Sequence, residues 1–339
     1  MGVKAGRVHN FGAGPAVLPI EVVEEVQMAL PNLMDSGFGL CEISHRSAIF
    51  QDVVDSAMGR VRRVLSVPDD YTVLFLQGGA SLQFYMTALN ILRTGEMADY
   101  IITGGWSKKA LAEANRVGDA QACWDGSNSG FKSVPNKGEY ELREQSIYLH
   151  YTSNNTLYGT QFHEPPSSGG KPLILDASSD IAGVPINVSS HDIIYAGAQK
   201  NLGPSGVTLV ILSPWAMSRV QEGIPTMLDY SVHASKGSLF NTPNTFGIFV
   251  LDCVFKWLEK NGGLDGAISR NRAKSNLLYK ELDRCQFWKP HADIDSRSVM
   301  NITWRLSNPK LEPLFLEEAK VAGLGGLKGH RSVGGIRAS

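Results

Sequence analysis

Residues 191–206 read HDIIYAGAQKNLGPSG and join an apolar run to a single lysine in a loop of small residues. The run from Asp192 to Ala198 is short and lacks polar alternation, which is typical of a strand covered on both faces of a sheet. Lys200 follows this strand almost directly. Lysines are rarely buried, so the local context alone leaves Lys200 as an ordinary solvated side chain.

Similar apolar runs recur along the chain and predict the fold class. They are YTVLFLQ (71–77), DYIITGG (99–105), SIYLHYT (146–152), PLILDAS (172–178) and GVTLVIL (206–212). Helix-like segments lie between several of them, and in residues 50–67 the apolar side chains follow helical spacing. The sequence therefore predicts an α/β architecture with a largely parallel sheet.

The pattern changes after residues 245–263, an apolar helix candidate that ends in two glycines. A charged helix, a strand, another helix and a basic glycine-rich tail follow. We place the boundary near Asn261 and expect a large cofactor-binding domain at 16–260. A smaller α/β domain would combine residues 1–15 with residues 261–339.

Composition argues against several kinds of partner. The chain is 43% apolar and 19% charged with a net charge of −1, so it offers no broad attraction to nucleic acid or an anionic membrane. No run is long enough to span a bilayer, and four scattered cysteines form no Cys-x-x-Cys pair. We expect a soluble cytoplasmic protein. The eight histidines show no metal-binding pair and no Gly-x-Ser-x-Gly elbow occurs, so we expect neither a metal site nor a serine hydrolase.

A strand, two glycines and a helix are predicted in FLQGGASLQF (75–84). A helix N-terminus after glycines presents unpaired N–H groups, so Gly79, Ala80 and Ser81 are candidates for holding a phosphate. A tight βα turn without a ligand is the alternative. The segment lacks the Gly-Lys-Ser/Thr of a Walker loop, and no strand runs into Gly-x-Gly-x-x-Gly.

Two further residues follow predicted strands. Asp176 ends the run PLILD, where open α/β sheets place groups that contact ligands, and Trp106 follows two glycines after another strand. The alternatives are a turn carboxylate and a packed aromatic side chain.

The tail LKGHRSVGGIRAS (327–339) gathers Lys328, His330, Arg331 and Arg337 among glycines. Arginine forks match carboxylate and phosphate geometry, so the tail is a candidate anion clamp, and a solvated basic loop is the alternative. His45 and Arg46 could add to the clamp if the fold brings them near.

Together these segments resemble the phosphoserine aminotransferase family, whose members bind pyridoxal phosphate in an aspartate-aminotransferase-like fold. The resemblance implies a large domain with a mostly parallel seven-stranded sheet and a smaller C-terminal domain. It covers nearly the whole chain, and the motifs that carry it are NFGAGPAVLP (10–19), EISHRS (42–47), FLQGGASLQF (75–84), GGWS (104–107), NNTLYGTQF (154–162), LDASSD (175–180), AGAQKNLGPSG (196–206), LFNTPNTF (239–246) and LKGHRSVGGIRAS (327–339).

The resemblance implies a role for each matching residue. Lys200 would bind the cofactor covalently and shuttle a proton, Asp176 would pair with the pyridinium nitrogen, and Trp106 would stack on the ring. The pKa of a lysine in that role is lowered from about 10.4 to a value of about 7 to 8. The other cofactor contacts implied are Ala80, Ser81, Thr156 and Gln199, with Asn241 and Thr242 from the second subunit of a homodimer.

The resemblance also implies the substrates. Arg337 would hold the α-carboxylate, while His330 and Arg331, with His45 and Arg46 of the other subunit, would hold the distal phosphate or carboxylate. Glutamate and phosphoserine could then share one pocket. The implied reaction is reversible transamination between glutamate and 3-phosphohydroxypyruvate, which yields 2-oxoglutarate and phosphoserine for serine biosynthesis.

Three departures from the family pattern bear on these expectations. Ser81 stands where some members have arginine, and Ala13 stands where others have serine. The family usually continues beyond IRAS, so we expect a shortened small domain in which Arg337 is loosely held. Two alternatives stay open: another class-V pyridoxal-phosphate enzyme, such as a cysteine desulfurase or an alanine–glyoxylate-type aminotransferase, or a shortened chain that binds cofactor without turnover.

Overall fold

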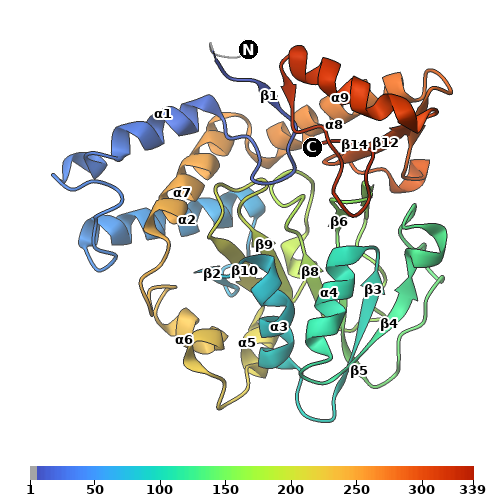
Figure 1. Ribbon diagram of the computed structural model, residues 1–339. Helices are drawn as coiled ribbons and strands as arrows, with labels where there is room; N and C mark the ends of the chain where they lie inside the picture. The colour runs from blue at the N-terminus through green and yellow to red at the C-terminus, as the bar shows by residue number, and fades with distance from the viewer. Residues whose placement is uncertain (1–5) are drawn as a thin grey trace.

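A seven-stranded sheet forms the centre of the computed structural model, which describes residues 6–339 (Figure 1). The strands lie in the order β2 (Thr72–Leu76), β10 (Thr208–Leu212), β9 (Ile193–Gly197), β8 (Leu173–Asp176), β5 (Ser146–Thr152), β3 (Met97–Ile102) and β4 (Asp119–Asp125). Within the described residues, β10 runs antiparallel to both of its neighbours and the other pairings are parallel. The predicted α/β fold with a mostly parallel sheet is confirmed.

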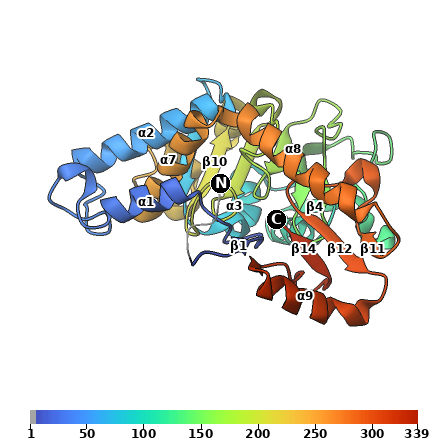
Figure 2. The ribbon, with the colours of Figure 1, turned by 90° about the horizontal axis from the view of Figure 1, so that it is seen from above.

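Helices cover both faces of this sheet, which explains why its strands lack polar alternation. Val73 and Phe75 of β2 belong to the core that includes α2 (Ala48–Leu65) and α7 (Thr245–Lys260). Their neighbours Leu74 and Leu76 belong to the opposite core, built with α3 (Gly79–Ile91), α4 (Gly105–Ala114) and α5 (Pro214–Arg219). α1 (Ile20–Ala29) packs on α7, and Figure 2 shows α1, α2 and α7 together. The strands of the sheet other than β4 therefore bury both rows of side chains.

The edge strand β4 was not predicted. Its residues Asp119–Asp125 read DAQACWD, and most of their side chains are exposed or half-buried. An edge strand that few other elements cover can carry polar side chains, so its sequence shows no apolar run.

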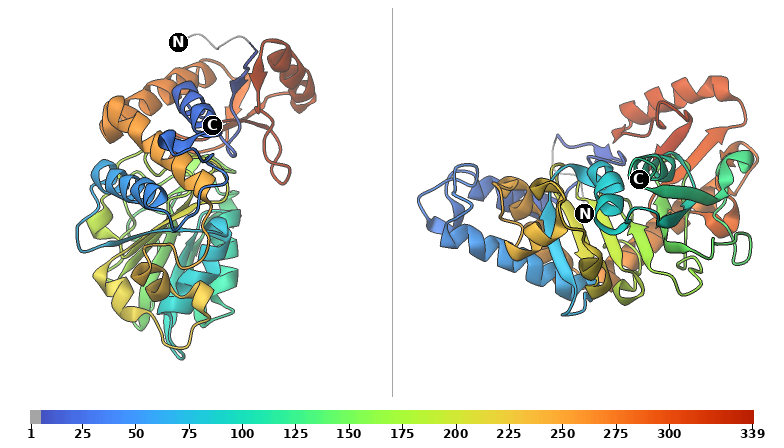
Figure 3. Two further views of the ribbon diagram at one scale, coloured as in Figure 1. Left: turned by 90° about the vertical axis from the view of Figure 1, so that its left-hand side faces the viewer. Right: turned by 90° about the horizontal axis from the view of Figure 1, so that it is seen from below.

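A second layer follows α7. The strands β11 (Trp288–Pro290), β12 (Ile302–Leu306) and β14 (Ile336–Ala338) form a small antiparallel sheet, which packs with α8 (Gly263–Leu282) and α9 (Glu312–Val321). β1 (His9–Asn10) pairs with β13 (Leu324–Gly325), so the beginning of the described chain joins this layer (Figure 3). The remaining elements are β6 (Asn154–Asn155), β7 (Thr160–Gln161), α6 (Tyr230–Ser235) and the 3₁₀ turns Leu33–Asp35, Gly126–Ser129, Val188–Ser190, Thr226–Leu228, Ile294–Ser296 and Pro309–Leu311.

The predicted boundary near Asn261 falls in the short gap between α7 and α8. Of the predicted small domain, residues 1–5 lie outside the described residues. No helix of residues 6–339 is both long and apolar enough to cross a membrane.

Candidate active site

Two adjacent parallel strands, β8 and β9, bring the central pair of residues together. Asp176 is the last residue of β8 and is paired with Tyr195 of β9, while Lys200 lies three residues beyond the end of β9. Their side chains emerge at the carboxyl edge of the sheet, where open α/β folds bind ligands. The N-terminal loop packs over this point, because Ala16 N–H donates to the Gln199 carbonyl at 2.8 Å. The two residues that the sequence singled out separately thus share one site.

Lys200 is half-buried and its ammonium has a short contact. Nζ donates to Thr156 Oγ1 at 2.6 Å and lies 6.0 Å from the Trp106 ring centroid. Burial lowers the pKa of Lys200 to about 8 and Arg337 lowers it too, whereas Asp176 and Asp180 oppose the shift. A substantial share of the amine is therefore neutral near pH 8, as a nucleophile or proton acceptor requires.

Asp176 is buried and is bonded on one side only. Its Oδ1 accepts hydrogen bonds from Ser178 N–H at 3.0 Å and from Ser178 Oγ at 2.6 Å. Burial raises the pKa of Asp176 above its usual value, while the bonds from Ser178 and the charge of Lys200 counteract the shift. Among residues 6–339 no group hydrogen-bonds Oδ2, so this oxygen suits a cationic N–H donor such as a protonated ring nitrogen.

The start of α3 offers donors to an anion. Gly78 and Gly79 adopt positive φ angles of 88° and 65°, which turn the chain sharply from β2 into the helix. The first-turn N–H groups, including those of Ala80 and Ser81, have no intrahelical acceptor, and the first turn contains no acidic residue. This end of α3 therefore suits a phosphate.

Trp106 lies in the first turn of α4. A Cβ on the preceding Gly104 would lie 1.9 Å from Asn155 Nδ2, so only glycine allows this close approach. Asn155 donates from that amide to the Thr103 carbonyl and so ties the loop after β3 to β6. Trp106 Nε1 is buried and has no hydrogen-bond partner among the described residues. The indole is held in place with its ring near Lys200.

Arg337 reaches the same site from the tail. It lies within β14, paired with Thr303 of β12, and its Nη1 donates to the Thr156 carbonyl at 3.0 Å. Burial lowers the pKa of Arg337. The expectation of a loosely held Arg337 is wrong, because strand pairing fixes its backbone.

His330 and Arg331 lie beside Arg337 in the tail. His330 Nδ1 lies 2.7 Å from Ser332 Oγ. Burial lowers the pKa of His330, and the charges of Arg337, Arg331 and Lys109 add to that effect. His330, Arg331 and Arg337 thus form a cationic cluster, and Arg337 brings it near Lys200, whose pKa it lowers.

Comparison with known proteins decides what this geometry belongs to. A family model described as aminotransferase class-V matches residues 8–339. The phosphoserine aminotransferases of Lysinibacillus sphaericus and Halalkalibacterium halodurans are 47% and 48% identical, each over 98% of this chain and 92% of the relative. The chain belongs to the phosphoserine aminotransferase family, within the class-V aminotransferases.

Solved structures agree with this membership. A phosphoserine aminotransferase from Bacillus circulans subsp. alkalophilus superposes with a TM-score of 0.96 at 44% identity, covering 99% of this chain and 93% of that chain. A phosphoserine aminotransferase from Trichomonas vaginalis with bound pyridoxal phosphate superposes at 0.93 with 32% identity, covering 98% and 95%. An alanine–glyoxylate aminotransferase from Nostoc shares only the fold, at 15% identity and a TM-score of 0.77. Pyridoxal phosphate is the cofactor of this family.

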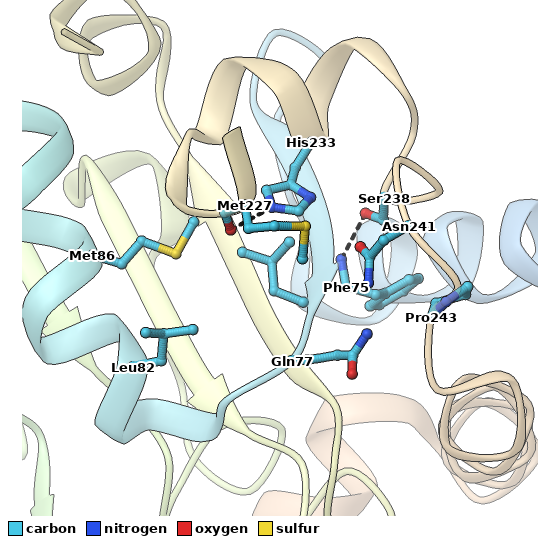
Figure 4. A pocket seen from close by; sticks show the side chains of 10 residues that line it. Phe75, Gln77, Leu82, Met86, Met227, His233, Ser238, Asn241 and Pro243 are labelled. Carbon is cyan, nitrogen blue, oxygen red and sulfur yellow. Dashed lines mark hydrogen bonds between the residues drawn. The ribbon is translucent and has the colours of Figure 1, made fainter. Parts of the chain in front are cut away.

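Four residues are expected to complete the site of a second subunit, and in the single chain they have other surroundings. Asn241 lines a small pocket with Gln77 and His233 (Figure 4). The Gln77 amide donates to the Thr242 carbonyl at 3.1 Å. The side chains of His45 and Arg46 make no hydrogen bond or ion pair within residues 6–339. Their contribution from a second subunit stays a prediction.

Sequence reasoning missed three residues of the site. Ser178 and Asp180 stood in the quoted motif LDASSD, but only the fold shows that Ser178 holds Asp176 and that Asp180 is buried behind it. Lys109, in the first half of α4, has its Nζ 4.6 Å from the Trp106 ring centroid. Its helical spacing of three residues from Trp106 was the available signal.

Proposed function

We propose that this chain transfers an amino group reversibly between glutamate and 3-phosphohydroxypyruvate, which yields 2-oxoglutarate and phosphoserine in serine biosynthesis. One observation carries the proposal. A lysine whose pKa is lowered to about 8 lies beside a buried aspartate, and a cationic cluster that includes Arg337 adjoins both. The high identity to phosphoserine aminotransferases over 98% of the chain supports the choice of substrates.

The residues present suit pyridoxal phosphate. Oδ2 of Asp176 would accept from the ring nitrogen, Trp106 would cover the ring, and the α3 N-terminus with Ala80 and Ser81 would bind the phosphate. Thr156 and Gln199 adjoin Lys200 and complete the contacts from the same chain. When bound, the cofactor supplies an aldehyde that condenses with amino groups and a cationic ring that withdraws electrons.

The chain's own residues then manage proton transfer. Substrate would displace Lys200 Nζ from the cofactor. The free amine would then take the proton from the substrate Cα and deliver it to the carbon that was the aldehyde carbon of the cofactor. Its lowered pKa keeps the amine available for this task. Asp176 would keep the ring nitrogen protonated, because no group of residues 6–339 hydrogen-bonds Oδ2 of its buried carboxylate.

The cationic cluster would orient the substrate. Arg337 would bind the α-carboxylate, and His330 and Arg331 the distal anion, together with His45 and Arg46 of a second subunit. Each of these groups is a cation or a hydrogen-bond donor at neutral pH, so the pocket accepts either a phosphate or a carboxylate at the distal position.

We also propose a homodimer in which Asn241 and Thr242 complete the cofactor site of the other subunit. The segment before α2 supports this, because Met28, Met34 and Phe38 are 77%, 63% and 58% exposed. Large apolar side chains that are exposed close together suit an interface. We further propose a cytoplasmic location and the division into domains at 16–260 and at 1–15 with 261–339, which the pairing of β1 with β13 supports.

A half-reaction tests the proposed activity. The purified chain loaded with pyridoxal phosphate is mixed with phosphoserine, glutamate or alanine, and the absorption of the cofactor is followed. We expect phosphoserine and glutamate to convert the cofactor to its amine form and alanine to do so far more slowly. Cofactor binding without conversion would show a binding protein without turnover, and conversion by alanine alone would indicate another class-V activity.

A further inference from the structure

Lys109 is an exposed cation over the Trp106 ring, without an ionic partner among the described residues. Its Nζ lies 4.6 Å from the centroid of the Trp106 ring, and its side chain is exposed. Within residues 6–339 no carboxylate pairs with it. The adjacent Lys108 differs, because its ammonium pairs with Asp125 at 3.6 Å and lies 5.1 Å from the Phe131 ring centroid.

The Trp106 ring connects Lys109 to the proposed substrate site. Lys200 Nζ lies 6.0 Å from the same ring centroid, and Lys200 and Arg337 share Thr156 as a hydrogen-bond partner. From the tail side, Lys109 is among the charges that act on His330. Contacts with Trp106 and proximity to His330 thus place the Lys109 ammonium between the cofactor-covering indole and the cluster proposed to hold the distal anion.

The charges that act on His330 here are all positive, those of Arg337, Arg331 and Lys109. Lys109 adds a flexible point charge to those of Arg331 and Arg337 beside His330, and no carboxylate of residues 6–339 forms an ion pair with it. A phosphate monoester carries a charge of about −1.5 to −2 at neutral pH and three acceptor oxygens, whereas a carboxylate carries one charge and two. A further cation at the rim therefore favours the phosphate more than the carboxylate.

We propose that Lys109 is a specificity-determining residue that binds the distal phosphate of the substrate in preference to a distal carboxylate. The inference rests on the proposed function, since it concerns the two substrates of that activity. The competing role is structural: the lysine stem would merely pack on the Trp106 ring and hold its orientation.

Binding of unreactive substrate mimics separates these roles. The holoenzyme is titrated with 3-phosphoglycerate, which carries a carboxylate and a phosphate, and with glutarate, which carries two carboxylates, and cofactor absorption reports binding. We compare K109M, which keeps the stem and removes the charge, with K109R, which keeps the charge, and with the matched control K108M. Both lysines lie on the exposed part of α4.

We expect K109M to weaken 3-phosphoglycerate binding about five-fold, the size of one exposed ion pair, and glutarate binding less than two-fold. K109R should restore phosphate binding, and K108M should change neither probe. The five-fold effect should shrink as salt rises from about 0.05 M to about 0.5 M, because an exposed pair is screened. In steady-state kinetics K109M should raise KM for phosphoserine with little change in kcat.

Four outcomes would overturn the inference. Equal weakening of both probes, or a fall in kcat with unchanged KM, would assign Lys109 to positioning Trp106. If K108M and K109M weakened binding equally, the effect would come from general surface charge. If K109M bound both probes as the unmutated chain does, Lys109 would be a solvated side chain. Failure of the proposed function is a separate result, because it would show as absent amino transfer from phosphoserine in the unmutated chain while probe binding can still be measured.

Discussion

The ammonium of Lys200 donates a 2.6 Å hydrogen bond to the hydroxyl of Thr156, a residue 44 positions earlier in the chain. The carbonyl of the same threonine accepts from Arg337, 181 positions later. Thr156 therefore fixes the distance between the proposed catalytic amine and the proposed carboxylate clamp.

Lys200→Ala should abolish covalent attachment of pyridoxal phosphate, because within residues 6–339 Lys200 is the amine whose charge acts on Asp176. Borohydride reduction followed by mass measurement of the chain checks this, with Lys108→Ala as the control that keeps attachment. An adduct of unchanged yield in the Lys200→Ala protein would show that a different lysine binds the cofactor.

The pH dependence of cofactor capture should follow the neutral form of Lys200. Because its pKa is lowered to about 8, the rate at which the cofactor-free protein reacts with pyridoxal phosphate should rise with pH and level off above about 8. Stopped-flow absorbance between about pH 6 and about pH 10 measures this rate on both sides of the transition. A rate that keeps rising toward the ordinary lysine value would contradict the lowered pKa.

Asp176→Asn should reduce amino transfer by about 100-fold or more, the usual loss when one electrostatic partner of the reacting group is removed. Since the charge of Asp176 raises the pKa of Lys200, the midpoint of cofactor capture should also move to lower pH. The fold should persist or gain stability in the cofactor-free variant, because the substitution removes a charge whose burial is unfavourable. Melting curves and the capture profile provide the two measurements, and a large loss of stability would instead assign Asp176 a structural role.

Arg337→Lys should weaken the binding of glutamate and of phosphoserine to a similar extent, about ten-fold each. Both substrates carry the α-carboxylate, and lysine cannot form the bidentate fork. The ratio of kcat/KM for the two substrates should stay near its original value. If kcat/KM falls for phosphoserine alone, Arg337 belongs to the distal anion site.

Asp180→Asn should change how stability depends on pH. Asp180 accepts from Ser153 Oγ at 2.6 Å and Gln161 Nε2 at 3.0 Å, yet burial raises its pKa from 3.8 to about 6. Between those values the folded chain holds a proton that the unfolded chain has released, so this group makes the protein less stable as pH rises from about 4 to about 6.

The variant should lose that contribution. Urea unfolding at several pH values should show a free energy that falls less steeply over this range in Asp180→Asn than in the original chain. Parallel curves for the two proteins would mean that Asp180 stays ionised throughout.

Much of the fold follows from local patterns in the sequence. Apolar runs of strand length predicted β2, β3, β5, β8, β9 and β10, because strands buried on both faces need no polar side chains. The polar edge strand β4 was missed for the converse reason. Lys200 and Asp176 stood out because each follows such a run.

The sequence by itself determined which residues end the strands and, through ordered motifs, which family the chain resembles. Only the tertiary structure decided that Thr156 joins Lys200 to Arg337 and that Lys109 faces the Trp106 ring. It also decided that Ser178 holds one oxygen of Asp176 while no described residue bonds the other. These relationships depend on strand order and on burial. Both arise from packing between segments far apart in the chain, which no local pattern of residues records.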